Sequence, residues 1–442
     1  MAVKIPNNFF GQNEPVNLGR QLTDFRMIPT DIPLLDDFNR FLRYLDGKPN
    51  IALTGAGDLK AVDLSALNER VEIKTPFPVT PRSRQADYPL LNLLFQITTA
   101  SRLYLVTFGK TNALIANTSR VEAYGELTRE EQYVFLLETA WCYADWGALD
   151  NEGRSGLGAE WFRRGFHQLL KNPVGSNVTL YERWGGEHDD PQRINITSMS
   201  NAYIRAGHWF GWYDMQEIQQ EKRDNYSLQL ERVTLTGWGQ QCLTLLLGQR
   251  PFHRWNQNAD GYVLISDTDD TDAEPVDINT FADVFRTQFH EPALISLYPV
   301  NPNPQTGEVW LRVELPHKVS RLIALPVSDS LDDLHLMIQD AFEFDNDHLY
   351  GFYLNLRDPY RGKQYFDPRT EPGWADGYPA DETTLASLNL YEGQRLLYRF
   401  DFGDTWKFVL TVVRHLPEQN ETKARVVEKA GKPPEQYGEN HW

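Results

Sequence analysis

Hydrophobic and polar residues follow a two-residue period most clearly near the end of the chain. Apolar and polar side chains alternate from Leu396 to Phe400, a pattern typical of a half-buried β-strand. Gly403 then stands between Asp401 and Asp404 and breaks the alternation, and residues 407–413 read as a second strand. The sequence therefore predicts a β-hairpin whose tip carries both carboxylates.

The residues before this hairpin predict more strands and one helix. Strands are expected over 309–315, 321–326 and 349–354, with a long polar excursion to about residue 386. Between them, Ser330 can accept a backbone N–H and Asp333 falls in the positive first turn, so a capped helix should begin here. One helix lying on a mostly antiparallel sheet is an α+β arrangement.

The N-terminal half changes to helical spacing. Helices are expected over 34–45, near 64–71 and from 90 onward. Two short strands, 103–106 and 113–115, then flank a turn that begins at Gly109 and so predict a hairpin. Thr128 and Glu131 form a capping box that opens a helix reaching Trp141. Helix, two-stranded wing and helix are the order of a winged-helix unit.

Part of this order recurs further along the chain. A helix is expected over 161–170, a second lies near the aromatic run 209–213, and a strand over 230–236 enters a helix at 237–247. These aromatics have Asp, Glu and Gly as neighbours, whereas stacking surfaces for nucleic acid are interleaved with basic residues. We therefore expect core packing for the tryptophans and tyrosines of both regions, which are Trp141, Tyr143, Trp146, Trp209 and Trp212.

The fold class expected is α+β, with a mainly helical, winged-helix-like N-terminal region followed by the C-terminal layer of one helix on a sheet. The residues at 267–275 are acidic and poor in apolar side chains, as in an exposed linker. The expected division is an arm (1–30), two winged-helix-like regions (31–150 and 151–265), an acidic linker with a short helix (266–294) and an α+β domain (295–442).

Composition and charge restrict the function. The chain has 442 residues, of which 41% are hydrophobic and 24% charged, as in globular proteins. The formal net charge of −18 opposes non-specific attraction to nucleic acid, so DNA is a possible but disfavoured partner. Two cysteines, Cys142 and Cys242, form no disulfide framework or metal-binding spacing. No signal peptide or membrane span is evident, which indicates a cytoplasmic protein without a membrane partner.

Three motifs were weighed against simpler interpretations. Gly55-x-Gly57 lacks the strand and helix that a phosphate-binding loop requires, so a turn is expected. The acidic run from Asp267 lacks the central glycine and the bidentate glutamate of a calcium loop. No nucleophile elbow is present to support a serine-based triad. No cofactor is therefore expected.

Four stretches resemble, in order and spacing, the plasmid pRiA4b ORF-3-like family, some members of which are described as transposon passenger or TnpR-like proteins. These stretches are residues 331–339, 345–352, 398–406 and 432–439, and the resemblance covers roughly 295–442. Two positions depart from the family pattern, because Phe408 replaces a histidine and Lys432 replaces a cysteine. The resemblance implies a fold and a setting among mobile elements, and it implies no particular reaction.

The side chains with chemical potential in this region are His335, His348, Asp401, Asp404 and Trp406. Imidazole and carboxylate groups together can hold a divalent metal or transfer protons, and His348, Asp401 and Asp404 are the candidate metal ligands. The structural alternatives are that His335 packs beside the apolar stripe of its helix, that the aspartates shape the turn, and that Trp406 anchors the hairpin. No catalytic residue is assigned.

The favoured interpretation is a non-enzymatic, multidomain interaction protein with a protein partner, linked to mobile elements. Two alternatives remain open. The first is a DNA-binding regulator that acts through the winged-helix-like region. The second is a metal-dependent hydrolase at His348, Asp401 and Asp404.

Overall fold

The computed structural model describes most of the chain in fifteen stretches. The acidic run at 267–275 and the first 27 residues lie outside them, as do residues 161–164 of one expected helix. The expected domain boundaries near 150 and 265 also fall outside, so these boundaries stay predictions. The described residues are 28–48, 50–108, 111–149, 165–181, 193–195, 201–217, 230–256, 280–289, 293–298, 305–316, 318–354, 356, 363–370, 377–417 and 423–437.

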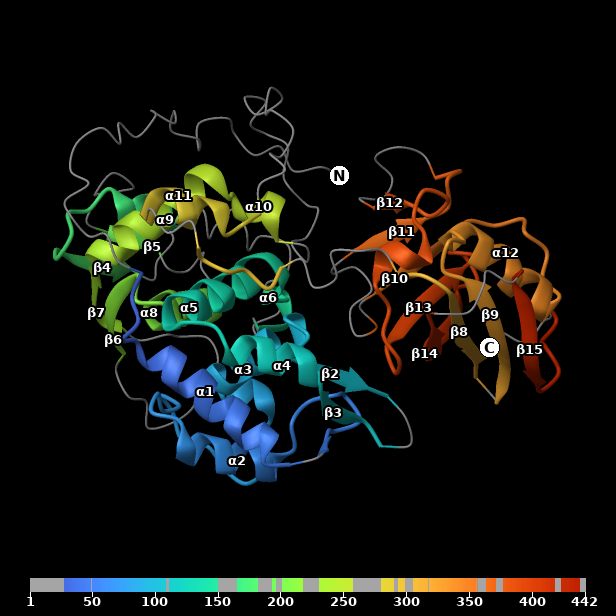
Figure 1. The fold of residues 1–442 in the computed structure, drawn as a ribbon, viewed down its shortest axis with the longest axis horizontal. Coiled ribbons are helices and arrows are strands. Elements are labelled where there is room, and N and C mark those ends of the chain that lie inside the picture. The colour runs from blue at the N-terminus through green and yellow to red at the C-terminus, as the bar shows by residue number, and fades with distance from the viewer. Residues whose placement is uncertain are drawn as a thin grey trace.

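The fold is α+β, as the sequence predicts, and its described residues contain two large hydrophobic clusters and a small third one of Tyr353, Phe366 and Leu397. The first cluster draws on residues 28–298 and is mainly helical, and the second draws on residues 309–426 and is built on a large sheet. Figure 1 shows them as two lobes, the first in blue to yellow and the second in orange to red. We call them the N-terminal lobe and the C-terminal lobe.

The first part of the N-terminal lobe contains the expected helices and hairpin. Its three-stranded sheet has the order β1-β3-β2, in which β1 and β2 each pair antiparallel with β3. The elements are α1 (Pro33–Asp46), β1 (Ile51–Ala52), α2 (Ala61–Arg70), η2 (Gln85–Asp87), α3 (Pro89–Ala100), β2 (Tyr104–Thr107), β3 (Ala113–Ala116), α4 (Thr118–Gly125), α5 (Arg129–Glu138), η3 (Thr139–Tyr143) and α6 (Trp146–Leu149).

The second part of this lobe has a four-stranded sheet of order β5-β4-β7-β6. Helix α8 precedes the β6–β7 hairpin, and α9 follows it, as expected from the strand that enters a helix at Gly237. The elements are β4 (Asn177–Tyr181), β5 (Arg193–Asn195), α8 (Asn201–Trp209), β6 (Tyr213–Glu217), β7 (Leu230–Leu235), α9 (Gly237–Gln249), α10 (Phe252–Trp255) and α11 (Asp283–Phe289).

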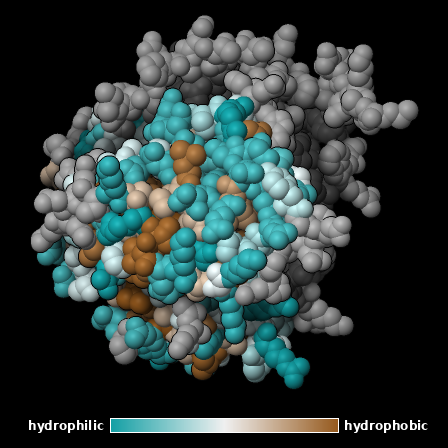
Figure 2. Space-filling model, turned by 90° about the vertical axis from the view of Figure 1, so that its right-hand side faces the viewer, coloured by the Kyte–Doolittle hydropathy of each residue, from teal (hydrophilic) through white to brown (hydrophobic). Residues whose placement is uncertain are grey.

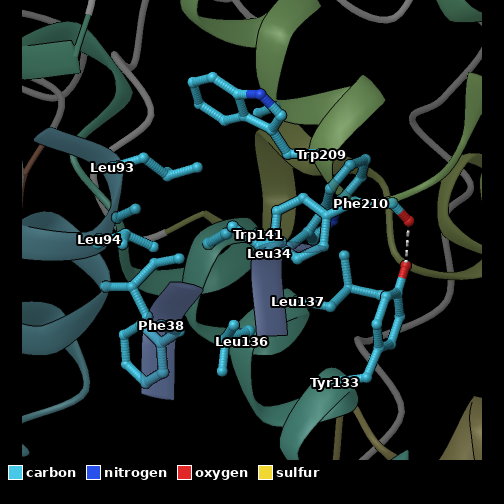
Figure 3. Packing of buried hydrophobic residues seen from close by; sticks show 14 of the residues in the cluster. Leu34, Phe38, Leu93, Leu94, Tyr133, Leu136, Leu137, Trp141, Trp209 and Phe210 are labelled. Atoms are coloured by element: carbon cyan, nitrogen blue, oxygen red, sulfur yellow. Dashed lines mark hydrogen bonds between the residues drawn. The ribbon is translucent and has the colours of Figure 1, made fainter. Parts of the chain in front are cut away.

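Aromatic side chains fill the N-terminal core. Figure 3 shows Leu34 and Phe38 of α1 near the leucines of α5, and the Tyr133 hydroxyl donates to the carbonyl oxygen of Phe210 at 2.8 Å. Trp141 is 1% exposed and donates from Nε1 to the carbonyl oxygen of Arg250. The expected core packing of these aromatics is therefore confirmed. Trp141 and Trp146 pair their indole N–H groups with backbone carbonyl oxygens, whereas Nε1 of Trp212 is buried without a partner among the described residues.

The C-terminal lobe is an eight-stranded sheet with one long helix. The strand order is β12-β11-β10-β13-β14-β8-β9-β15, and every pair except β11–β12 is antiparallel. The apolar face of α12 packs into the second cluster on one face of this sheet. The elements are β8 (Glu308–Leu315), β9 (Val319–Pro326), α12 (Leu331–Phe342), β10 (Tyr350–Tyr353), β11 (Gln364–Phe366), β12 (Tyr378–Pro379), η5 (Leu385–Leu388), β13 (Arg395–Phe400), β14 (Trp406–Leu416) and β15 (Arg425–Ala430).

Two helix starts expected from the sequence are confirmed in atomic detail. The Thr128 hydroxyl accepts from the backbone N–H of Glu131, whose carboxylate accepts from the N–H of Thr128. Ser330 and Asp333 form the same reciprocal pair at the start of α12. Each box satisfies two backbone donors that a helix end leaves without partners.

The structure also differs from the sequence expectations. The helix from Thr128 becomes a π-helical turn at Thr139–Tyr143, where the Thr139 hydroxyl donates to the carbonyl oxygen of Phe135. The polar excursion before residue 386 contains β11 and β12, and β15 adds an edge strand after the final hairpin. These three strands are short or carry charged residues, so their period-2 pattern is weak.

An extended segment, 293–298, leads from the N-terminal lobe toward the sheet, and side chains of the helices hold its backbone. Glu131 accepts from the N–H of Ile295, Arg120 donates to the carbonyl oxygen of Leu297, and Arg286 donates to that of Leu294. Tyr298 at its end is 7% exposed and stacks on Tyr143 at 4.4 Å. The segment is thereby fixed to the N-terminal lobe without a sheet partner.

The described residues on one face of the molecule are mainly hydrophilic (Figure 2). Figure 2, which faces the right-hand side of Figure 1, shows hydrophobic residues only as small areas between hydrophilic ones. None of the described helices combines the length and the apolar character needed to cross a bilayer.

Candidate functional site

His335 lies on the buried face of α12 and is 0% exposed. Its Nδ1 is 2.6 Å from the hydroxyl of Tyr398 on β13, and its Nε2 is 2.9 Å from Oδ1 of Asn346. The imidazole also stacks on the ring of Tyr350, with centroids 3.8 Å apart and planes 9° apart. The side chain therefore joins the helix, the loop after it and two strands.

The hydrogen bonds around His335 favour one proton arrangement. Gln339 Nε2 donates to the Tyr398 hydroxyl at 2.8 Å, so the hydroxyl proton is free to go to Nδ1 of His335. Nε2 then carries the imidazole proton and donates to Asn346. Burial lowers the pKa of His335, against a smaller opposite effect of the Asn346 hydrogen bond. A neutral imidazole with both nitrogens engaged has no lone pair left for a metal.

An ion pair between a buried carboxylate and a half-exposed guanidinium lies beside this network. Asp367 has a side chain that is 1% exposed, and it receives bonds from Nε and Nη2 of Arg369 at 3.0 and 2.6 Å. Arg369 Nη2 also donates to the carbonyl oxygen of His348 at 2.9 Å. The guanidinium therefore fixes the backbone from which the His348 side chain projects.

His348 is the one candidate that meets carboxylates at the surface. Its Nε2 is 3.5 Å from Oδ2 of Asp401 and 3.5 Å from Oδ2 of Asp347. The His348 side chain is 42% exposed, whereas that of Asp401 is 14% exposed. The structure thus brings together one expected pair, His348 and Asp401, with Asp347 as a neighbour that we did not single out.

Asp401 also shapes the tip of the hairpin. Its Oδ1 accepts from the backbone N–H groups of Gly403 at 2.9 Å and Asp404 at 3.3 Å. The left-handed positions of the tip are Asp401 (φ 54°) and Thr405 (φ 60°), whereas Gly403 has no positive φ. The tip is therefore shaped by the aspartate side chain, a common role of Asp in turns.

Asp404 does not join the site. Its side chain is exposed, and the described ion pairs of His348 are with Asp347 and Asp401. Trp406 lies apart in the core, where it is 8% exposed and its ring is 4.9 Å from that of Phe344. Its Nε1 is buried without a hydrogen-bond partner. The geometry thus places Trp406 in packing and leaves Asp404 at the surface.

The C-terminal tail closes over the loop that carries His348. Tyr437 donates its hydroxyl proton to Oδ2 of Asp347 at 2.6 Å, and Gln436 Nε2 donates to Oδ1 at 3.0 Å. The tyrosine hydroxyl is the main cause that lowers the pKa of Asp347, and the same bond raises the pKa of Tyr437 to about 12. The tail therefore occupies carboxylate oxygens that would otherwise face His348 alone.

The imidazole of His348 thus lies between the carboxylates of Asp347 and Asp401. Oδ1 of Asp401 already accepts from the hairpin backbone, and both oxygens of Asp347 accept from the tail. Within the described stretches, no group of three His, Cys, Asp or Glu side chains is placed to hold a metal ion. Asp332 also belongs to the network around His335, because it accepts a hydrogen bond from the Tyr350 hydroxyl. The residues that sequence reasoning missed are Asp332, Asn346, Asp347, Tyr350, Asp367 and Arg369. Asp-Pro-Arg at 367–369 was the one available signal, since such a tripeptide commonly forms a local turn.

Comparison with known proteins confirms the expected resemblance for this part of the chain. Residues 308–441 match the sequence model of the family described as plasmid pRiA4b ORF-3-like protein. A relative from Sinorhizobium fredii, named uncharacterized protein y4hQ, is 31% identical over 137 residues, which is 29% of this chain and 66% of the relative. The match thus spans slightly less than two thirds of that relative's length.

A crystal structure described as a protein of unknown function, MM3350 from Methanosarcina mazei Go1, is also similar over part of the chain. It shares 19% sequence identity and covers 29% of this chain and 71% of its own, with a TM-score of 0.24. This likeness adds nothing to the description of the fold.

Proposed function

We propose that this chain, whose residues 308–441 match the pRiA4b ORF-3-like family, is a non-enzymatic interaction protein with a protein partner. Its N-terminal lobe is a pair of winged-helix units that serve as a scaffold, and its setting is that of mobile elements. The observation that carries this proposal is the burial of most residues in the two helices that a DNA-binding winged helix would place in the major groove.

The two sheets of the N-terminal lobe support the winged-helix interpretation. In each, a first strand pairs antiparallel with the last strand of a later hairpin, as β1 does with β3 and β4 with β7. A helix directly precedes each hairpin, α3 before β2–β3 and α8 before β6–β7. A first strand, a helix and a hairpin follow one another in both units, as in a winged helix, although α2 in the first unit and β5 in the second stand between the strand and that helix.

Neither of these helices has a face for DNA. Helix α3 contains no lysine or arginine, and residues 90–95, 97 and 98 are all buried. Helix α8 has one arginine, Arg205, which is 8% exposed and donates to both carboxylate oxygens of Glu217 at 3.1 and 2.5 Å. Since affinity for DNA comes largely from free cations near phosphates, the buried helices and the net charge of −18 disfavour the DNA-binding alternative.

The hydrolase alternative also has weak support. Its three candidate ligands were His348, Asp401 and Asp404, of which only the first two lie close together. Asp401 uses one oxygen to hold the hairpin tip, and Tyr437 occupies Asp347. Hydrogen bonds of this kind stabilise a loop and do not leave an open coordination position.

Three measurements on the full chain test the proposal. Fluorescence anisotropy with a duplex DNA at low ionic strength should show no saturable binding, although electrostatic attraction is then greatest. Thermal unfolding with and without a chelator should give the same midpoint, and elemental analysis should find no stoichiometric metal. Saturable duplex binding, or a metal whose loss accompanies loss of hydrolysis, would replace this proposal with one of the alternatives.

The protein partner is tested by chemical crosslinking in the source cells, followed by mass spectrometry of purified complexes. The expected result is a crosslinked partner protein recovered at constant stoichiometry. The chain recovered alone, or crosslinked only to itself, would contradict a partner.

A further inference from the structure

A row of three polar side chains crosses the face of the C-terminal sheet that α12 does not cover. Arg395 of β13 is directly opposite Thr411 of β14, which is directly opposite Arg312 of β8. The next residues in the same register, Leu396, Leu410 and Val313, point into the second hydrophobic cluster. Because successive residues of a strand point to opposite faces, the row lies on the face opposite α12, which also carries the small cluster of Tyr353, Phe366 and Leu397.

Two of these side chains carry hydrogen-bonding atoms that no residue in the described part of the chain satisfies. Nε of Arg395 and Oγ1 of Thr411 are both buried, and both lack a hydrogen-bond partner. A buried polar atom without a partner costs about 1–3 kcal/mol, so such atoms need an explanation. Directly opposed residues have Cβ atoms about 4.5–5.5 Å apart, so one ligand can reach both.

The row is positively charged although the chain as a whole is acidic. The closest acidic group to Arg312 is Glu428, at 3.6 Å, and these side chains are 34% and 54% exposed. An exposed pair at this distance contributes little, so a ligand can compete for the guanidinium. Lys407 lies two residues before Val409 on β14 and is exposed on the same face. Glu314 is the acidic neighbour on β8.

The N-terminal lobe forms one border of the row. The ring of Phe108, just after β2, lies 5.1 Å from the Arg395 guanidinium, and the Phe108 N–H donates to the carbonyl oxygen of Gly393. Gly393 has φ +86°, and a Cβ there would lie 2.9 Å from Cβ of Thr107. The β2–β3 hairpin thus approaches the strand end closely and holds Arg395 by a cation–π contact.

We propose that Arg395, Thr411 and Arg312 form a binding site for the phosphate group of a small molecule. All three side chains donate hydrogen bonds, and guanidinium groups bind oxyanions through paired N–H donors. A carboxylate offers two oxygens in one plane, whereas a phosphate offers at least three in a tetrahedral arrangement. Donors on three neighbouring strands therefore match a phosphate better. This site is independent of the interaction role proposed above.

The test is calorimetric titration of the full chain with inorganic phosphate, and separately with adenosine 5′-monophosphate, at constant ionic strength set with chloride. Saturable binding of phosphate is expected. Arg395→Gln and Arg312→Gln should each weaken it by about tenfold or more, because each removes a charged hydrogen bond. Lys429→Gln on β15 removes one exposed positive charge elsewhere and should leave the affinity unchanged.

Thr411→Val is the variant that separates a binding role from a structural one. It keeps the shape and the charge but removes a hydroxyl that has no partner among the described residues. Without phosphate it should therefore leave the unfolding midpoint unchanged or raise it, and it should still weaken phosphate binding by about threefold to tenfold. If the affinity for adenosine 5′-monophosphate is at least tenfold above that for phosphate, the bound phosphate group belongs to a nucleotide. Equal affinities would identify free phosphate as the ligand.

Absence of saturable heat with either probe up to about 20 mM would overturn the site, since weaker binding has no specificity. Equal affinities in the parent and in Arg395→Gln, Arg312→Gln and Thr411→Val would overturn it as well. Circular dichroism of each variant shows whether it is folded. If an arginine variant unfolds, Thr411→Val, which alters no charge, still tests the site.

Discussion

The hydroxyl of Tyr398 lies 2.6 Å from Nδ1 of His335 and joins β13 to α12 inside the second hydrophobic cluster. The same hydroxyl accepts from Gln339, so its own proton goes to the imidazole. In this buried network each donor has a single acceptor, so the hydrogen bonds depend on one another. Removing one side chain leaves the others without partners. The packing of α12 on the sheet therefore depends on a neutral histidine.

Stability of the C-terminal lobe should fall as the pH falls through the range in which His335 takes up a proton. Burial lowers the pKa of His335 below its ordinary value of 6.5, so between the two values the unfolded chain binds more protons than the folded one. The stabilisation is complete above about pH 6.5 and is lost as the pH falls through the folded-state pKa. Urea unfolding between pH 7.5 and 5 measures it.

The matched variant is His335→Gln, which keeps hydrogen-bonding groups but cannot titrate. It should be less stable than the parent at pH 7.5, by about 2–4 kcal/mol for a disrupted buried network. Its stability should decline less steeply below pH 6.5. Identical slopes in parent and variant would show that His335 does not control the acid sensitivity.

Glu138 should make the stability of the N-terminal lobe depend on pH in the opposite direction. Burial is the main cause that raises the pKa of this 2% exposed carboxyl from 4.5 to about 7, opposed by the Ser296 hydroxyl, which donates to it, and by Arg286 and Arg120. The folded chain thus binds more protons between these values. The stabilisation from the protonated carboxyl is complete below about pH 4.5 and is lost as the pH rises through 7.

Glu138→Gln provides the comparison, because the amide oxygen can still accept from Ser296. From pH 5 to pH 8, the free energy of unfolding of the variant should rise relative to that of the parent by up to about 3 kcal/mol, since each pKa unit corresponds to about 1.4 kcal/mol. Thermal unfolding at several pH values measures the difference. A constant difference across this range would contradict a buried, titrating Glu138.

Trp406→Ala should destabilise the C-terminal lobe by about 3–5 kcal/mol, because the side chain is 8% exposed and packs on Phe344. Trp406→Phe should cost less, since it keeps most of the ring contact and removes an N–H that has no partner. Chemical unfolding of the three proteins gives the comparison. A loss below about 1 kcal/mol for Trp406→Ala would mean that the ring is not part of the core.

The two aspartates of the hairpin should differ in their effect. Asp401→Ala removes the acceptor of two backbone N–H groups and places alanine at φ 54°, so a loss of about 1–3 kcal/mol is expected. Asp404→Ala serves as the control and should change the free energy of unfolding by less than about 0.5 kcal/mol. Equal losses at the two positions would contradict the role assigned to Asp401.

The sequence alone determined the elements whose signals are local. The capping boxes at Thr128 and Ser330 each depend on two residues three positions apart. The alternation from Leu396 to Phe400 follows from the two-residue period of a strand. The family resemblance of the last third rests on motifs of the same kind. Such short patterns can be interpreted from the sequence because the residues that interact are close together in the chain.

Only the tertiary structure decided which of the candidate side chains meet. Asp401 and Asp404 are three residues apart and look equivalent in the sequence, yet the carboxylate of Asp401 lies 3.5 Å from Nε2 of His348, whereas Asp404 is exposed at the surface. The row of Arg395, Thr411 and Arg312 spans a hundred residues and arises from strand register. Such contacts depend on pairing between distant strands, which no local pattern specifies.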